Sequence, residues 1–424
     1  MSSDSKEASA QMQPPSSARS AGHAQIAPTP RISLQAFCET QEMATLIGEA
    51  AADRRLEKAH VKVNMGGASA AVEAYRTSPT PNVIVIESSV GRDELMSQLE
   101  ALAEFCDSGT KVMVIGRVND ITLYRELISR GVSDYMVAPF GVMDFVAALS
   151  AQYNQDTSTP LGRVIAVTGA KGGVGASCVA HNLAWSIARE LDASTVIADF
   201  DLPFGTAGLD FNQDPPQGIA EAVFAPDRLD SNLLDRLLSK CSDKLSILAA
   251  PATVERSYDL SEQSFDGLMD LLRASTPYIV VDVPHVWTAW SRRILVAADE
   301  AVLVASPELA SLRNAKSLLD NLRAARKNDP APRLVLNGVG LPKRPEITPA
   351  DFAKAVEVEP CATIAFDAKT FGTAANNGQM IAEMEDGAKS AQIFTDLARM
   401  VTGRSAIKRE SKGFLEPLLA VFRG

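Results

Sequence analysis

This sequence of 424 residues is short of several features, and each shortage excludes a class of protein. No apolar run approaches the roughly 20 residues that cross a bilayer, and the N-terminus lacks the apolar core of a signal peptide. The five cysteines are scattered without metal-ligand spacing, which argues against a zinc site or a disulfide framework. The net charge of −11 argues against DNA binding through overall electrostatic attraction. We therefore expect a cytoplasmic protein whose partners are not nucleic acids.

What the chain does contain is typical of a globular protein. Apolar residues make up 46% and charged residues 22% of it, and its length favours two or three domains. Residues 1–30 are rich in Ser, Ala, Pro and Gln and are predicted to be disordered, because they bury too little surface to offset their ordering entropy. A linker over residues 154–162 separates a domain over 31–153 from a domain over 163–403. Residues 404–424 are predicted to form a basic linker and an amphipathic tail.

Both domains alternate short apolar strands with helical patterns, which predicts α/β folds with parallel sheets covered on both faces. The first domain has five such units, and about 120 residues in this pattern indicate a flavodoxin-like strand order. The second domain has seven candidate strands, and several end in an acidic or polar residue where the chain turns. Ligands of open parallel sheets bind at these carboxyl ends.

The segment VIAVTGAKGGVGASCVAHN, residues 164–182, reads as a strand, a glycine loop and the start of a helix. Glycines permit the backbone angles that turn N–H groups inward as an anion nest, and a helix N-terminus adds its dipole. Ser177 lies where a hydroxyl reaches Mg²⁺ in such loops. The segment therefore predicts a phosphate-binding loop in a P-loop domain, although a tight turn without a ligand is the alternative.

The pattern G-x-x-x-x-G-K-[ST] is broken at two positions, because Ala170 replaces its first glycine and Ala176 replaces its lysine. The lost lysine removes a charge-assisted hydrogen bond of about 1.5–3 kcal/mol, which weakens ATP binding roughly 10- to 150-fold. Hydrolysis loses more, since charge stabilisation counts most in the transition state. Lys171, however, precedes the glycine pair. KGGVG with a leading lysine resembles the deviant Walker A loop of ParA/MinD ATPases.

This resemblance implies ATP and Mg²⁺ as cofactors, and a homodimer in which Lys171 reaches phosphates across the interface. The cofactor-binding residues that it implies are Lys171, Gly172, Gly173, Val174, Gly175, Ala176, Ser177, Cys178, Asn337 and Asp367. Asn337 would contact adenine, and Asp367 and Gly378 would belong to the loop around the base. The alternative for Asn337 is a turn residue beside Gly338.

Three aspartates stand at predicted strand ends, where carboxylates near a phosphate nest are placed to bind Mg²⁺ directly or through water. Asp199 and Asp201 follow one strand, and Asp282 ends another. The resemblance implies that Asp201 orients the attacking water, so that it and Lys171 are the candidate catalytic residues. Ser177, Asp199 and Asp282 become the candidate metal group. For any one of these aspartates, a solvated or capping role is the alternative.

The first domain resembles the receiver domain of response regulators, but the residues of its phosphorylation chemistry are replaced. GVSDYMVAPF resembles the last receiver strand, with Ala138 in place of a lysine before Pro139. Glu87 stands where a receiver has its phosphorylated aspartate, and Gly116 where it has a hydroxyl residue. Because the extra methylene of Glu87 displaces the carboxylate, we predict a pseudo-receiver used for docking or dimerisation. An α/β domain of other ancestry is the alternative.

A receiver-like domain followed by a ParA/MinD-like domain is the arrangement of the CpaE/TadZ family, the localisation and assembly factors of the Tad (Flp) type IV pilus secretion system. GAKGGVGASCVAHNLAWSIA is similar to the CpaE branch. The resemblance implies a platform at a cell pole that meets the pilus secretion ATPase and inner-membrane components. ATP would mainly stabilise a dimer, and its hydrolysis would be slow or absent. The alternatives are an active ParA/MinD-type positioning ATPase and a scaffold that binds no nucleotide.

The C-terminal segment KGFLEPLLAVFRG is predicted to form an amphipathic helix downstream of Lys408, Arg409 and Lys412. An apolar helical face beside cations is typical of a helix in a membrane interface, so peripheral membrane contact is one interpretation. Docking onto protein is the other.

Overall fold

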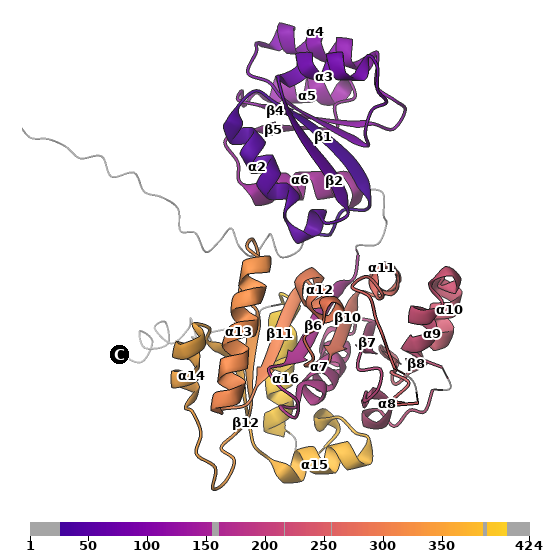
Figure 1. Cartoon of the computed structure of the whole chain (residues 1–424), viewed down its shortest axis with the longest axis vertical. Helices are drawn as coiled ribbons and strands as arrows, with labels where there is room; N and C mark the ends of the chain where they lie inside the picture. Colours follow the sequence, from indigo (N-terminus) through magenta and orange to yellow (C-terminus); the bar gives the residue numbers. More distant parts are fainter. Residues whose placement is uncertain (1–25, 155–160, 216, 256, 385–387, 405–424) are drawn as a thin grey trace, which may run out of the picture.

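The computed structural model describes residues 26–154, 161–215, 217–255, 257–384 and 388–404. The predictions for residues 1–25, for most of the linker and for the amphipathic tail fall outside these residues. Two α/β units, the first domain over Ile32–Asn154 and the second domain over Arg163–Val401, lie end to end (Figure 1). No helix in the described part of the chain combines the length and apolarity that crossing a membrane requires.

The first domain is a parallel five-stranded sheet with the order β2-β1-β3-β4-β5, which confirms the predicted flavodoxin-like order. Its central strand is buried along its whole length because helices cover both faces. Helices α2 and α6 pack on one face, and α3, α4 and α5 pack on the other. The elements are β1 Ile32–Cys38, α2 Gln41–Ala51, the short 3-10 helix η2 Arg54–Leu56, β2 Ala59–Met65, α3 Gly67–Tyr75, β3 Val83–Glu87, α4 Arg92–Ala103, β4 Lys111–Gly116, α5 Ile121–Ser129, β5 Asp134–Val137 and α6 Val142–Asn154.

The second domain is an eight-stranded sheet with the order β13-β12-β11-β6-β10-β7-β9-β8. The seven predicted strands are present and parallel, whereas the antiparallel edge strand β8 was missed because its two residues, Ser and Lys, carry no apolar signal. The strands are β6 Arg163–Gly169, β7 Thr195–Asp199, β8 Ser239–Lys240, β9 Leu245–Leu248, β10 Tyr278–Val283, β11 Glu300–Ala305, β12 Arg333–Val339 and β13 Pro360–Ala365.

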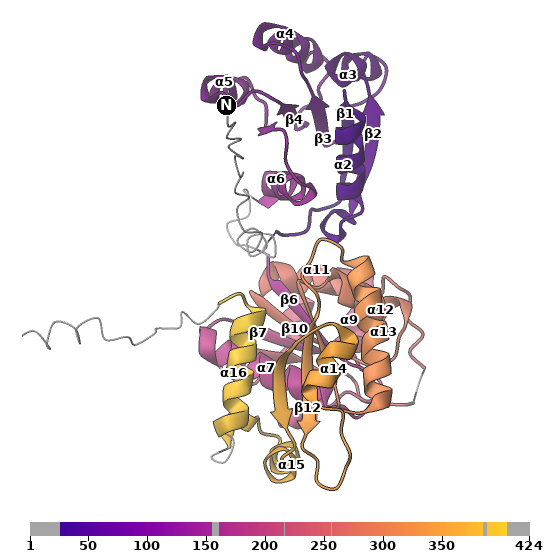
Figure 2. The ribbon, with the colours of Figure 1, turned by 90° about the vertical axis from the view of Figure 1, so that its left-hand side faces the viewer.

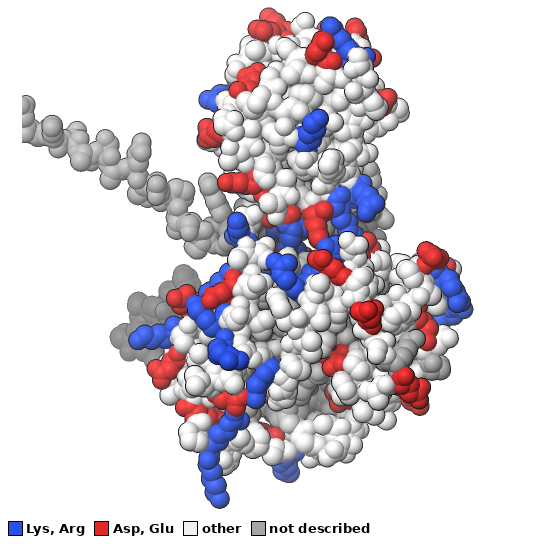
Figure 3. All heavy atoms as spheres, in the orientation of Figure 1, with Lys and Arg blue, Asp and Glu red and all other residues white. Residues whose placement is uncertain are grey.

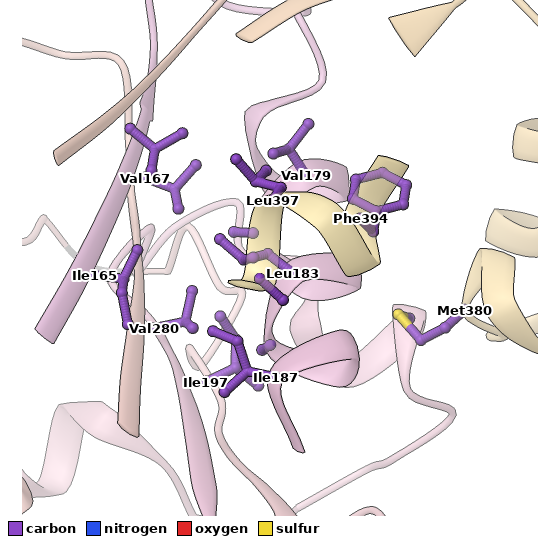
Figure 4. Packing of buried hydrophobic residues seen from close by; sticks show 14 of the residues in the cluster. Ile165, Val167, Val179, Leu183, Ile187, Ile197, Val280, Met380, Phe394 and Leu397 are labelled. Carbon is purple, nitrogen blue, oxygen red and sulfur yellow. The ribbon is translucent and has the colours of Figure 1, made fainter. Parts of the chain in front are cut away.

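Helices cover both faces of this sheet, as Figure 2 shows from its edge. On one face α7 and α16 bury Leu183, Ile187 and Leu397 against Ile165 and Val280 (Figure 4). On the other face lie α9 to α14. The helices are α7 Ala176–Leu191, α8 Ala207–Asp210, α9 Ile219–Phe224, α10 Ser231–Leu237, α11 Asp266–Ser275, α12 Ala289–Ala297, α13 Leu309–Ala325, α14 Pro349–Val356, α15 Ala368–Asn377 and α16 Ala388–Val401.

The two domains meet at the amino-terminal edge of the second sheet. Arg54 of η2 donates from Nε to Asp329 Oδ2 at 2.6 Å and from Nη1 to the carbonyl of Ala297 at 3.0 Å. Arg55 also pairs with Asp329, and both members of each pair have side chains at most 3% exposed. Ala297 ends α12 and Asp329 precedes β12, so the first domain lies at the edge opposite the carboxyl ends of the strands.

Two more exposed ion pairs also join the two domains. Lys58 Nζ lies 2.6 Å from Asp270 Oδ1, and Glu57 pairs with Arg293. Figure 3 shows the positive and negative side chains gathered between the two domains. We call Arg54, Arg55 and Asp329 the junction cluster.

Candidate functional site

The glycine loop connects β6 to α7 at the carboxyl edge of the second sheet. Gly173 and Gly175 have φ angles of 79° and 83°, in the left-handed region that favours glycine. The helix that follows has 16 residues, so its free N–H groups and dipole point at the loop. A Cβ on Gly175 would lie 2.4 Å from Nδ2 of Asn337, which leaves no room for a larger residue. These backbone angles are compatible with the predicted anion nest, and phosphate binding by the loop stays a prediction.

Asn337, at the end of β12, supports this loop from the side. Its Nδ2 donates to the carbonyl of Val174 at 2.8 Å, and its Oδ1 accepts from the N–H of Gly338 at 2.9 Å. Both polar ends of the side chain thus bind backbone. These contacts support the turn and loop-bracing role, while the adenine contact stays a prediction.

Lys171 is held within its own chain by Glu308, the residue before α13. The ammonium pairs with Glu308, whose carboxylate also pairs with Arg344. The Lys171 side chain is 38% exposed, and a solvent-exposed pair of this kind contributes about 0–1 kcal/mol. Phosphate oxygens can therefore compete with Glu308 for this lysine at little cost.

The candidate metal group comes together beside the loop. Asp199 and Asp282 are opposite each other on the neighbouring strands β7 and β10, and both are buried. Burial, together with the charge of Asp282, raises the pKa of Asp199 to about 7. Burial also raises the pKa of Asp282, although the hydroxyl of Ser177 donates to it and opposes the shift. Two buried carboxylates in contact with a hydroxyl form an oxygen-rich donor set that fits a divalent cation.

Asp201 lies just beyond β7 and is half-buried. Its N–H donates to Asp199 at 3.1 Å, and its carboxylate accepts from the N–H of Phe204 at 3.2 Å. Burial raises its pKa, which the Phe204 bond and the nearby His285 oppose. The carboxylate caps a turn in this arrangement, and its role with an attacking water stays a prediction.

For the remaining predicted site residues, the observed contacts do not show a role in binding a ligand. Val174 is buried under the loop, and burial raises the pKa of Cys178 to about 12, so its thiol is unreactive. Asp367 caps α15 by accepting from the N–H of Thr370 at 3.0 Å, and this bond lowers its pKa. Gly378 ends the same helix with a φ of 61°. These contacts of Asp367 lie within the first turn of α15, so its place in a base-binding loop stays a prediction.

Two histidines that showed no metal spacing in sequence lie at this site. His181 is fully buried, and its Nδ1 lies 2.7 Å from Asp210 Oδ2. The ring of His285 covers Gly172, where a Cβ would lie 3.2 Å from its Cε1. A signal for His181 does exist in the sequence, because it follows Ser177 by four residues and so shares its helix face.

Several large apolar side chains are exposed at the sheet edge that carries the glycine loop. Each follows the carboxyl end of a strand of the second sheet: Phe204 after β7, Val286 and Trp287 after β10, Leu309 after β11 and Phe366 after β13. Phe204 and Leu309 are 70% and 74% exposed. We call these residues the loop face. Exposed apolar residues grouped around a polar centre mark an interaction surface.

In the first domain, both carboxylate oxygens of Glu87 accept hydrogen bonds from the turn before α2. Its Oε2 accepts from the N–H groups of Glu39 and Thr40 at 2.7 and 2.9 Å, and its Oε1 accepts from the Thr40 hydroxyl at 2.7 Å. A Cβ on Gly116 would lie 2.3 Å from the hydroxyl of Tyr135, so the tyrosine occupies the space of a hydroxyl side chain there. The carboxylate therefore fastens the turn before α2.

We expect the chain to take up no phosphoryl group from acetyl phosphate, and the Glu87→Asp variant to take up none either. Aspartate restores the nucleophile, but Ala138 supplies no cation and Tyr135 fills the space beside Gly116. Intact-mass measurement checks this, with a functional receiver domain as the control for the reagent. A stoichiometric phosphoryl adduct on residue 87 of either chain would contradict the prediction.

No family model matches the chain. The chain is 46% identical to a solved pilus assembly protein CpaE from Caulobacter crescentus CB15, over 30% of this chain and 97% of that chain, with a TM-score of 0.30. A ParA family ATPase from Chlorobium tepidum TLS is 27% identical over 56% of this chain and 98% of that chain, with a TM-score of 0.51. The septum site-determining protein MinD from Pyrococcus horikoshii OT3, solved in complex with Mg-ADP, is 21% identical over 59% of this chain and 100% of that chain, with a TM-score of 0.50.

Among curated proteins, the septum site-determining protein MinD of Synechocystis is 31% identical over 166 residues, or 39% of this chain. The chain spans 60% of the length of that relative. The ParA likeness confirms the predicted P-loop fold of the second domain. The 46% identity over 97% of the solved CpaE chain relates this chain to the pilus assembly proteins.

Proposed function

Because the chain belongs to the family of CpaE pilus assembly proteins, we propose that it localises and assembles a Tad (Flp) type IV pilus secretion system, with ATP as a dimerisation switch. Hydrolysis is weak or absent. The observation that carries this proposal is the glycine loop, which keeps a phosphate nest, Lys171 and Ser177 while Ala176 stands in place of the lysine.

The residues around the loop fit Mg²⁺ and ATP. The N–H groups of residues 172–175 and of the first turn of α7 would bind the phosphates. Ser177, Asp199 and Asp282 would hold Mg²⁺, directly or through water. A bound Mg²⁺ withdraws charge from the phosphate oxygens. With alanine at position 176, less positive charge faces the transferred phosphoryl group, so the site favours binding over turnover.

The loop face provides the surface for a second copy of the chain. Its apolar residues lie at the same sheet edge as the nest, and Lys171 is held by a weak pair with Glu308. A nucleotide at the nest would add phosphate charge at the centre of this surface. Lys171 of each copy would then exchange Glu308 for the phosphates of the other, which makes dimerisation depend on ATP.

The proposed setting is cytoplasmic, at a cell pole beside the inner membrane, where the chain meets the secretion ATPase and inner-membrane components of the pilus system. The first domain suits this role as a docking module, because Glu87 is used to hold its own backbone. Peripheral membrane contact through residues 404–424 belongs to the proposal.

The proposal is tested by calorimetric titration of the full chain with ATP and Mg²⁺, combined with sedimentation. ATP is expected to bind and to convert monomer to dimer, while the Lys171→Ala variant binds ATP without dimerising. If the chain bound no ATP at millimolar concentration, the second domain would instead be a scaffold that binds no nucleotide. Multiple turnovers by the unmodified chain would instead support an active positioning ATPase.

We expect Phe204→Glu to abolish the ATP-dependent dimer, because it would bury a charge in the apolar loop face. Ile121→Glu is the matched control, since Ile121 is a comparably exposed apolar residue on α5 of the first domain, with 66% of it exposed against 70% for Phe204. Sedimentation with ATP should show a dimer for the control and a monomer for Phe204→Glu. Dimerisation of both variants would place the interface elsewhere.

A further inference from the structure

The proposed function assigns no role to one buried nitrogen at the site, Nε2 of His181. His181 lies on α7, one turn beyond Ser177, and its side chain is fully buried. Its Nε2 makes no hydrogen bond to any described residue and lies 3.7 Å from Asp282 Oδ2. This distance is too long for a hydrogen bond, so in the neutral ring the lone pair of Nε2 faces the carboxylate of Asp282 without a donor.

The spacing of the surrounding groups fits one ion. Single ligand atoms of His181, Asp199 and Asp282 all lie within 4.8 Å of one another. Two ligand atoms bound to the same ion at about 2.1 Å, in a tetrahedral arrangement, are about 3.4 Å apart. The 3.7 Å between His181 Nε2 and Asp282 Oδ2 is close to this value. Small side-chain movements would bring Asp199 to the same ion.

The other ring nitrogen of His181 is already fixed. Its Nδ1 lies 2.7 Å from Asp210 Oδ2, so it carries the proton that Asp210 accepts when the ring is neutral. Metal-binding histidines commonly donate their second nitrogen to a carboxylate, which orients the ring and raises the basicity of the binding nitrogen. Asp210, only partly buried, therefore acts as a positioning residue for Nε2.

We propose that His181 Nε2, Asp199 and Asp282 form a binding site for a divalent transition-metal ion of the Zn²⁺ or Co²⁺ type. Imidazole nitrogen selects such ions over Mg²⁺, which prefers oxygen ligands only. The two buried carboxylates attract the positive ion. Three protein ligands leave one position open to water or another donor. The site needs no nucleotide.

The site shares Asp199 and Asp282 with the Mg²⁺ group of the proposed function, and only this competition between the two ions rests on that function. A transition-metal ion held by His181 would occupy both carboxylates. Mg²⁺ would then be excluded from its proposed ligands until the tighter ion is removed.

The test uses the full chain, stripped of metal and free of nucleotide, titrated with Co²⁺ under visible absorption and then with Zn²⁺. We expect one Co²⁺ per chain, with the visible bands of a low-coordinate ion and displacement by Zn²⁺. His181→Gln should abolish the bands. Asp210→Asn should weaken binding about 10- to 100-fold, as loss of an orienting carboxylate does elsewhere. His285→Gln, which changes an exposed histidine beside the loop, should bind as the unmodified chain does.

Circular dichroism and the melting temperature verify that each variant is folded, and Asp210→Asn keeps the test valid if His181→Gln does not fold. Bands that survive in both variants, an intense thiolate charge-transfer band from a cysteine, or no Co²⁺ bound at all would overturn the proposal. A chain that binds Mg-ATP without Co²⁺ would overturn this inference alone. A chain that binds Co²⁺ without ATP would overturn the nucleotide switch alone.

Discussion

Asp329→Ala is expected to destabilise the chain by about 3–5 kcal/mol and to separate the unfolding of its two domains. The change breaks the two buried ion pairs that Asp329 makes with Arg54 and Arg55, while Arg54 keeps Asp299 and Arg55 keeps Asp53 as partners. Removing one partner of a buried ion pair costs about 3–5 kcal/mol. Because the same carboxylate links the first domain to the second, each domain also loses the stabilisation that it draws from the other.

Differential scanning calorimetry measures this effect. Tryptophan fluorescence identifies which transition belongs to the second domain, since all three tryptophans are in it. The matched control is Asp270→Ala, which breaks another pair across the same boundary, with Lys58 and Asp270 side chains 36% and 58% exposed. We expect at most about 1 kcal/mol from the control. Equal effects of the two variants would show that the junction cluster does not hold the domains together.

Lowering the pH should also destabilise the junction between the domains. Burial alone would raise the pKa of Asp329, but its hydrogen bond to Arg54 and the neighbouring arginine charges outweigh burial and lower it. A carboxylate whose pKa is lower in the folded chain contributes stability that is complete above its unfolded pKa. That contribution is lost as the pH falls through the lowered folded value. Asp329→Ala should therefore lose less stability on acidification than the unmodified chain.

Ala176→Lys is expected to tighten ATP binding about 10- to 150-fold and to raise turnover above that of the unmodified chain. Position 176 begins α7, directly after Gly175 of the nest, so an ammonium there can reach the phosphates. One charge-assisted hydrogen bond contributes about 1.5–3 kcal/mol, which corresponds to that change in affinity. The gain in rate follows because the charge that develops on the phosphoryl oxygens acquires a cation.

The matched control is Ala176→Met, which adds a side chain of similar length without the charge. Titration calorimetry gives the affinity, and release of phosphate gives the rate. If methionine and lysine have the same effect, the change acts through packing rather than through charge. If lysine tightens binding without any turnover, the acidic group beside the loop does not support hydrolysis.

Much of the fold could be predicted because its signals are local. Strands such as Val83–Glu87 are buried on both faces and therefore read as unbroken apolar runs. The glycine loop is equally visible, since the left-handed angles at Gly173 and Gly175 require residues without a Cβ. The sequence also places Asp199 and Asp282 at strand ends, and the structure shows that these two strands are neighbours.

The features that escaped prediction depend on partners far away in the chain. Arginines are mostly exposed in proteins, yet Arg54 and Arg55 are buried and pair with Asp329, about 275 residues further on. Glu87 could be a displaced nucleophile or a backbone cap, and only the position of the turn before α2 decides between them. His181 lies on an apolar helix, where the sequence does not reveal that its ring is aimed at carboxylates.

The position of the junction has a consequence for any pair of chains that forms through the loop face. The first domain is attached at the amino-terminal edge of the second sheet, and the loop face is at the carboxyl edge. Two chains joined loop face to loop face would therefore carry their first domains outward, at the far ends of an elongated rod. Such a rod is bivalent, since each end presents the same docking module. Simultaneous binding to two copies of a target would then raise the overall affinity without any new contact, and only while the rod stays assembled.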